Sequence, residues 1–103
     1  MQKQKPIRIK KIRESARGQD CAAGVIGICN GNQETTVLAH YGEAGEKGMG
    51  LKPDDTSAAY LCSSCHDAMD GRVPGMTQGS REYAWFRAMR RTWRLLIENG
   101  VLS

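Results

Sequence analysis

The stretch Leu61-Cys62-Ser63-Ser64-Cys65-His66 decides how this chain can fold. A Cys-x-x-Cys turn points two thiols at one position, which is the arrangement that zinc sites use. Two more cysteines, Cys21 and Cys29, lie upstream with seven residues between them, a wider spacing that requires the chain to double back. A closed all-thiolate site would use every cysteine of the chain. We therefore predict a structural Zn²⁺ bound by Cys21, Cys29, Cys62 and Cys65.

The size and composition of the chain indicate that its fold needs the added stability of a bound metal. Its 103 residues are the length of one domain, and one Phe, two Trp and twelve Gly leave only a thin hydrophobic core. A structural zinc contributes on the order of 10 kcal/mol to folding, which is enough to decide whether a small domain forms. We therefore expect the metal to be part of the fold.

Two disulfides are the alternative use of these thiols, in any of three pairings, if the protein is secreted. The basic N-terminal stretch has no apolar segment typical of a signal peptide, and no run of about 18 apolar residues could cross a membrane. We therefore expect a cytoplasmic location in the host cell, no membrane partner, and reduced thiols that bind metal.

Charge is distributed in three blocks. Residues 1–17 carry a net charge of +6, residues 18–80 carry −5, and residues 81–98 carry +3. Basic flanks suit a polyanionic partner, which favours DNA, although a solvated tail and an ordinary helix face would give the same pattern. The candidate groups for contacts with the DNA backbone are Lys52, Arg87, Arg90, Arg91 and Arg94.

The N-terminal half shows short elements separated by turns. Residues 1–14 are predicted to be a basic arm, with residues 5–13 forming either a short edge strand or a segment that orders on DNA, and residues 15–103 to be a single domain. Asn30-Gly31-Asn32 predicts a tight turn. The β-branched and apolar residues 35–40 predict a strand that ends at His40, and residues 41–55 form a long loop.

The C-terminal half is predicted to be helical. Residues 62–70 read as a turn and a short helix that ends at Gly71, with His66 and Asp70 on one face. A longer amphipathic helix should begin with Ser80 as its cap and end at Gly100. Its expected packing face is made by Trp85, Phe86, Met89, Trp93, Leu96 and Ile97. We expect this stripe to be core and not a platform for base stacking.

Two histidines remain if the thiols bind zinc. His40 would end a strand and His66 would begin a helix, both next to the cysteines that bring these elements together. One imidazole can act as a general base on water while the other helps to hold a divalent cation, and phosphodiester hydrolysis needs both roles. In a second interpretation His66 replaces a cysteine as a zinc ligand.

These residues resemble a known motif. A strand ending in histidine, a loop, and then Leu61-Cys62-Ser63-Ser64-Cys65-His66 opening a helix is similar to the ββα-metal (His-Me finger) core of HNH-type nucleases with an embedded four-cysteine zinc site. Over residues 15–100 the chain more narrowly resembles a family of small prophage-encoded nucleases. The resemblance implies a small zinc-stabilised α+β domain with a C-terminal amphipathic helix. It also implies His40 as general base and His66 as a ligand of a catalytic Mg²⁺ or Mn²⁺.

The chain departs from the HNH pattern in two places. Ala39 precedes His40, where many HNH enzymes carry a metal-binding Asp or His, and no asparagine lies between His40 and Cys62. Glu34, Asp54 or Asp55 could supply the missing group. The expected function is a metal-dependent DNA endonuclease, and the alternative is a non-catalytic zinc-containing DNA-binding or adaptor module of phage origin.

Overall fold

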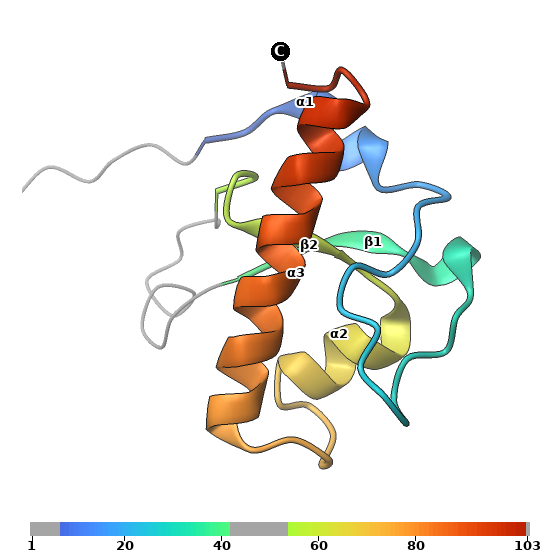
Figure 1. The fold of residues 1–103 in the computed structure, drawn as a ribbon, viewed down its shortest axis with the longest axis vertical. Coiled ribbons are helices and arrows are strands. Elements are labelled where there is room, and N and C mark those ends of the chain that lie inside the picture. The colour runs from blue at the N-terminus through green and yellow to red at the C-terminus, as the bar shows by residue number, and fades with distance from the viewer. Residues whose placement is uncertain (1–6, 42–53, 103) are drawn as a thin grey trace, which may run out of the picture.

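The computed structural model describes residues 7–41 and 54–102, which form a small α+β fold (Figure 1). The elements in chain order are α1 (Lys10–Ser15), the 3-10 turn η1 (Gln33–Thr35), β1 (Val37–His40), β2 (Ala58–Leu61), α2 (Ser63–Met69) and α3 (Gln78–Glu98). Within these described ranges, no helix is long and apolar enough to span a bilayer. The α+β class predicted from the sequence is confirmed.

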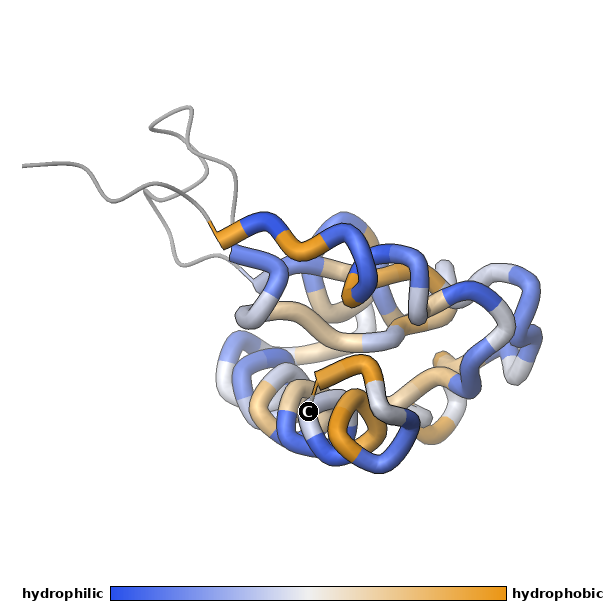
Figure 2. Tube along the Cα trace, turned by 90° about the horizontal axis from the view of Figure 1, so that it is seen from above, coloured by the Kyte–Doolittle hydropathy of each residue, from blue (hydrophilic) through white to orange (hydrophobic). Residues whose placement is uncertain are grey.

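The two strands form an antiparallel sheet that lies between α1 and α3 (Figure 2). Val37 pairs with Leu61 and His40 pairs with Ala58, so His40 lies at the end of the sheet where β2 begins. Every residue of β2 is at most 1% exposed. A short, continuously apolar run such as Ala58–Leu61 is typical of a strand that is covered on both faces.

The outer edge of β2 is closed by groups from other elements. The backbone N–H of Tyr60 donates to the Thr92 hydroxyl of α3 at 3.1 Å, and its carbonyl accepts from Ala22 N at 2.7 Å. An open strand edge would leave these polar groups without partners inside the protein. The edge contacts therefore attach both α3 and the segment that follows Cys21 to the sheet.

Helix α3 differs from the sequence prediction at its start and in its packing face. Thr77, and not Ser80, caps the helix, because the Thr77 hydroxyl accepts from Ser80 N at 3.1 Å. The buried residues of the helix recur every three or four positions and are Trp85, Ala88, Thr92 and Leu96. The predicted core positions Phe86, Trp93 and Ile97 are instead 53%, 41% and 65% exposed. The two-stranded sheet is narrow, so only part of the apolar surface of α3 can pack on it. The hydrogen bond that Thr92 accepts from Tyr60 N determines which face of α3 lies against the sheet.

The described part of the predicted N-terminal arm is packed against the domain. Residues 10–15 form α1 and not an edge strand, and Ile12 is fully buried, with Ile9 and Ala16 on the same face. Ile12 and Ala16 are four residues apart, as on one face of a helix, whereas the strand prediction relied on the alternation of Ile7 and Ile9 before it. Residues 1–6 lie outside the described part.

Candidate metal centre and histidine site

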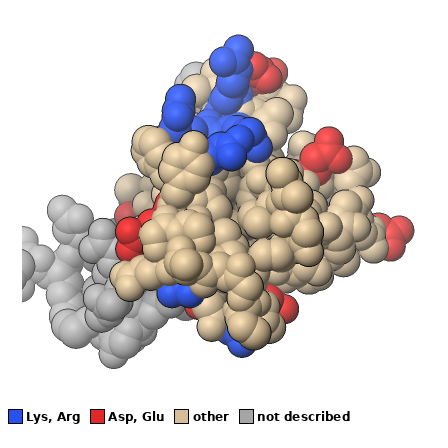
Figure 3. Space-filling model, turned by 60° about the horizontal axis from the view of Figure 1, so that its bottom comes forward, with Lys and Arg blue, Asp and Glu red and all other residues tan. Residues whose placement is uncertain are grey.

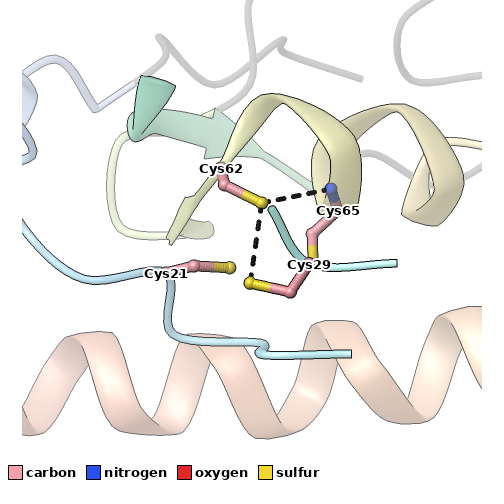
Figure 4. Close-up of side chains that lie close together, drawn as sticks. All are labelled: Cys21, Cys29, Cys62 and Cys65. Carbon is pink, nitrogen blue, oxygen red and sulfur yellow. Dashed lines mark hydrogen bonds between the residues drawn. The ribbon is translucent and has the colours of Figure 1, made fainter. Parts of the chain in front are cut away.

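The four cysteines converge from three parts of the chain (Figure 4). Cys21 and Cys29 flank an irregular loop, Cys62 is the N-cap of α2, and Cys65 lies in its first turn. All four cysteines are free thiols, and their sulfur atoms lie within 4.8 Å of one another. The Sγ atoms of Cys29 and Cys62 are 3.8 Å apart. Zinc–sulfur bonds of about 2.3 Å in a tetrahedron give sulfur pairs about 3.8 Å apart, so the cluster fits Zn²⁺.

Backbone N–H groups surround the sulfur atoms. Cys65 N lies 3.4 Å from Cys62 Sγ, and Asn30 N also donates to this sulfur. Burial alone would raise the pKa of Cys62, but these donors stabilise the thiolate and bring its pKa down to about 7. Burial dominates at Cys29 and Cys65 and raises their pKa values. A cation among the sulfurs would favour all of the thiolates, which is how structural zinc acts.

The predicted turn after Cys29 joins the two halves of the metal centre. Gly31 has a φ of +67°, and the Asn30 side-chain oxygen accepts from Asn32 N at 2.8 Å. The amide nitrogen of the Asn30 side chain donates to the Ser63 and Ser64 hydroxyls at 3.1 and 3.3 Å. A loop from the first cysteine pair is thus bonded to the helix start that carries the second pair.

His40 lies at the end of β1 and contacts a buried carboxylate. Its Nε2 is 2.8 Å from Asp55 Oδ1, and the two side chains are 22% and 0% exposed. An ionised carboxylate can only accept a hydrogen bond, so in the neutral ring Nε2 carries the proton and Nδ1 is the basic nitrogen. Of the three acidic candidates, Glu34, Asp54 and Asp55, it is therefore Asp55 that contacts and orients His40.

Asp55 also binds the N-terminal segment. Its carboxylate accepts from Ile9 N at 2.6 Å and from Arg13 Nη1 at 2.8 Å, and Arg8 Nη1 lies 3.6 Å away. Burial would raise the pKa of Asp55, but the bonds from His40, Ile9 and Arg13 and the charge of Arg8 together lower it. Neither arginine could be predicted from the sequence as a partner of Asp55, because more than 40 residues separate each from it.

The lowered pKa of Asp55 predicts a pH dependence of stability. The folded pKa lies below the ordinary value of 3.8, so its contribution is complete above that value and is lost as the pH falls through the folded pKa. Near neutrality we expect Asp55→Asn to lower the free energy of unfolding by on the order of 2 kcal/mol. Urea unfolding of both zinc-loaded proteins near neutral pH measures the difference. The difference should shrink only below pH ~4, where protonated thiols also release a bound metal. An Asp55→Asn protein as stable as the wild type near neutrality would contradict the charge pairing.

His66 and Asp70 form a second pair on α2. His66 Nε2 lies 3.1 Å from Asp70 Oδ2, as their spacing predicted, and Arg72 Nη2 lies 3.1 Å from the same carboxylate oxygen. This end of α2 lies near the end of β1, because Trp85 donates to Met69 O at 3.0 Å and its ring packs edge-on against Tyr41 with centroids 5.5 Å apart. His66 is not part of the sulfur cluster, so the interpretation in which it replaces a cysteine is wrong.

The remaining carboxylate candidates have other roles in the described residues. Asp54 accepts from Ile7 N at 2.7 Å, and Glu34 lies in η1, where it lines a hollow with Arg13 and Arg17. Ala39 is 1% exposed. Among residues 7–41 and 54–102, only the four cysteines bring three or more potential metal-binding side chains close together.

A match to a known family agrees with this arrangement. A sequence model of the family described as "Putative nuclease YbcO" matches residues 10–101. The chain belongs to the YbcO family. Two relatives of that name, from Escherichia coli K-12 and from Enterobacteria phage 82, are each 40% identical to it over 92 residues, which is 89% of this chain and 96% of theirs. A solved structure titled as that of a bacteriophage protein from E. coli K-12 is 37% identical, with a TM-score of 0.74, and the match covers 87% of this chain and all of that one.

The YbcO relatives bear out two predictions at a general level. Their name confirms the resemblance to a nuclease family, and the phage relative confirms the expected link to phages. The matched region includes all four cysteines and both histidines. It begins within the predicted arm, at the first residue of α1, which agrees with the packing of α1 on the sheet.

The predicted DNA-binding arginines of this YbcO chain lie along α3. All four are exposed and line a hollow of about 560 Å³ together with Ile97, and Figure 3 shows Lys and Arg side chains gathered at the top of the view, over α3. Arg91 also has a structural bond, from its Nη1 to Ala22 O at 2.9 Å. Lys52 lies outside the described residues. Together Arg87, Arg90, Arg91 and Arg94 form the basic face of α3.

Proposed function

We propose that this protein is a metal-dependent DNA endonuclease that uses His40 as its general base. The observation that carries the proposal is the His40–Asp55 pair, 2.8 Å apart at the end of β1. A buried carboxylate that holds one imidazole nitrogen leaves the other directed to a reacting group, as in other histidine-based hydrolytic sites. The nuclease name of the YbcO relatives gives independent support for phosphodiester hydrolysis.

His40 would take a proton from the attacking water at Nδ1. The proton that Nε2 already shares with Asp55 stays in place, and the ionised carboxylate stabilises the imidazolium that forms. The side chain of His40 is 22% exposed, which lets water reach the ring. Asp55 acts here as a positioning residue and would supply the group that this chain lacks relative to the HNH pattern.

The order of elements supports an HNH-like interpretation of the site. β1 and β2 are antiparallel and α2 follows directly, with His40 at the end of the first strand and His66 on the helix. The cysteine cluster fixes the start of α2 against the loop that precedes β1. These are the elements of a strand–strand–helix motif with an embedded zinc site.

His66 and Asp70 are the candidate ligands of a catalytic divalent ion. Mg²⁺ is commonly held by one or two protein carboxylates together with phosphate oxygens of the substrate, so a pair with one carboxylate fits this ion. When bound, Mg²⁺ or Mn²⁺ would stabilise charge that develops on the scissile phosphate. Arg72, 3.1 Å from Asp70, holds the carboxylate at this end of α2.

The N-terminal segment would add positive charge beside His40. Arg8 and Arg13 share one carboxylate, Asp55, and their side chains are 37% and 36% exposed. The excess positive charge favours a bound phosphate, and together with the basic face of α3 it would provide contacts to the DNA backbone. Such contacts position a strand without reading its sequence.

A non-catalytic DNA-binding or adaptor module is the second candidate. The observation that favours it is the buried Ala39, which occupies the position of a metal ligand in many HNH enzymes and has no donor atom. In this case the zinc-bound fold would be used for binding alone.

Cleavage assays on the zinc-loaded chain test the proposal. Supercoiled plasmid and labelled oligonucleotides are incubated with added Mg²⁺ or Mn²⁺, or with neither ion. We expect nicked or linear products only when one of the ions is present, because the charge on the phosphate needs it. DNA that is bound but stays intact under every condition would reject catalysis in favour of the binding module.

A further inference from the structure

Helix α3 exposes aromatic rings beside the basic face. Tyr83 and Phe86 are 63% and 53% exposed, although the sequence pattern placed Phe86 in the core. The guanidinium of Arg87 lies over the Tyr83 ring at 5.7 Å, and that of Arg90 lies over the Phe86 ring at 5.4 Å. Both pairs are four residues apart, so they repeat along one side of the helix.

The repeated pairs form a stripe along α3, from Tyr83 past the arginines to Ile97. At a rise of about 1.5 Å per residue this stripe is roughly 21 Å long. The hollow of about 560 Å³ lies along it. The opposite side of the helix, with Trp85, Ala88 and Leu96, is buried on the domain. The rings of Tyr83 and Phe86 therefore lie outside the core, and the face of each ring that its guanidinium does not cover is available for a ligand.

The charges along the stripe determine which occupant it fits. A second copy of the chain packed symmetrically on this face would bring the four arginines of the basic face against their own counterparts, and like charges in contact are unfavourable. A strand of nucleic acid supplies the opposite charge. Its bases can also stack on aromatic rings and on guanidinium planes, whatever the sequence.

We infer that the stripe on α3 binds a single-stranded or unpaired segment of nucleic acid, with bases stacked at Tyr83 and Phe86 and phosphates on the arginines. This inference rests on the proposed nuclease function, because it specifies the form of the substrate. Bases in an intact duplex have their faces covered by their neighbours and cannot reach the two rings. The α3 surface would thus select DNA that contains an unpaired region.

The experiment measures binding without cleavage. The zinc-loaded full chain, without added Mg²⁺ or Mn²⁺, is titrated into fluorescein-labelled oligo(dT) and into a labelled hairpin duplex, and anisotropy gives the affinities. Tyr83→Ala and Phe86→Ala should each weaken binding of oligo(dT) by about fivefold or more, the loss expected for one stacked base. Both variants should bind the duplex as the wild type does.

Ile26→Ala is the control, because Ile26 is an exposed apolar residue without a ring and lies outside the stripe. It should bind oligo(dT) like the wild type, and all three variants should melt at the wild-type temperature because the three side chains lie outside the core. Unchanged oligo(dT) binding by the aromatic variants, an equal loss on duplex, or an equal loss in Ile26→Ala would overturn the inference. A wild-type dimer in sedimentation velocity that Phe86→Ala dissociates would also overturn it, in favour of a protein interface.

Cleavage by the same proteins separates this inference from the proposed function. If the wild type cleaves DNA with Mg²⁺ and the aromatic variants bind oligo(dT) normally, the inference falls and the nuclease function stands. If the aromatic variants lose oligo(dT) binding but no protein cleaves DNA, the binding surface stands and the catalytic proposal falls.

Discussion

Cys65→Ser is expected to leave the domain unfolded at neutral pH. Cys65 is fully buried at the start of α2, and its sulfur is one of four that lie within 4.8 Å of one another. Losing one thiolate removes most of a metal contribution that is on the order of 10 kcal/mol, whereas small domains have a total stability of about 5–15 kcal/mol. Circular dichroism and measurement of bound zinc per chain test this expectation.

Ser64→Ala is the matched control in the same turn. The Ser64 hydroxyl bonds to the Asn30 side chain at 3.3 Å and is not a metal-binding group. This variant should fold and retain one zinc per chain, with a loss of stability of about 1 kcal/mol. A Cys65→Ser protein that folds and binds zinc like the Ser64→Ala protein would contradict the structural role of the metal.

His40→Ala is expected to reduce DNA cleavage by about a hundredfold or more, which is the scale of a lost general base. The side chain is partly exposed and belongs to neither the cysteine cluster nor the basic face, so zinc content and DNA affinity should stay at wild-type levels. Single-turnover cleavage with saturating protein measures the chemical step separately from binding.

Two further measurements distinguish catalysis by His40 from a structural effect. Added imidazole should partly restore cleavage by His40→Ala, because a free base can take the place of the missing ring, and a folding defect would not respond in this way. Asp55→Asn should lower kcat with little change in KM, since the residue positions the base without contacting substrate. Wild-type cleavage by His40→Ala would mean that another group activates the water.

Local spacing was enough to predict several parts of the site. The Cys62-x-x-Cys65 turn, the Asn30-Gly31 turn and the pairing of His66 with Asp70 all depend on residues within five positions of one another. The α+β class of the fold was implied by the resemblance to the ββα-metal motif. Asp55, by contrast, was one of three acidic candidates for a role beside His40, because the glycine-rich sequence between them carries no periodic pattern that would predict its path.

The errors arose where tertiary contacts compete with local patterns. In α3 the large apolar residues predicted a broad packing face, but Thr92 lies at its centre, since its hydroxyl satisfies the N–H at the edge of β2. In the N-terminal segment the helical conformation buries Ile12, while Ile9 before the helix is partly buried, and the bonds of Asp55 hold the start of the helix. Each of these partners lies more than 30 residues away along the chain.

The bonds between the N-terminal segment and Asp55 bear on where this protein can be shortened. A fragment that begins at Lys10, the first residue of α1, would keep every helix, strand and cysteine described above. It would still lack Arg8 and the backbone of Ile7 and Ile9, which contact Asp54 and Asp55. Such a fragment could bind zinc and melt normally while His40, the proposed general base, had lost part of its support. A trimmed protein that fails to cut DNA would therefore say nothing about the full chain.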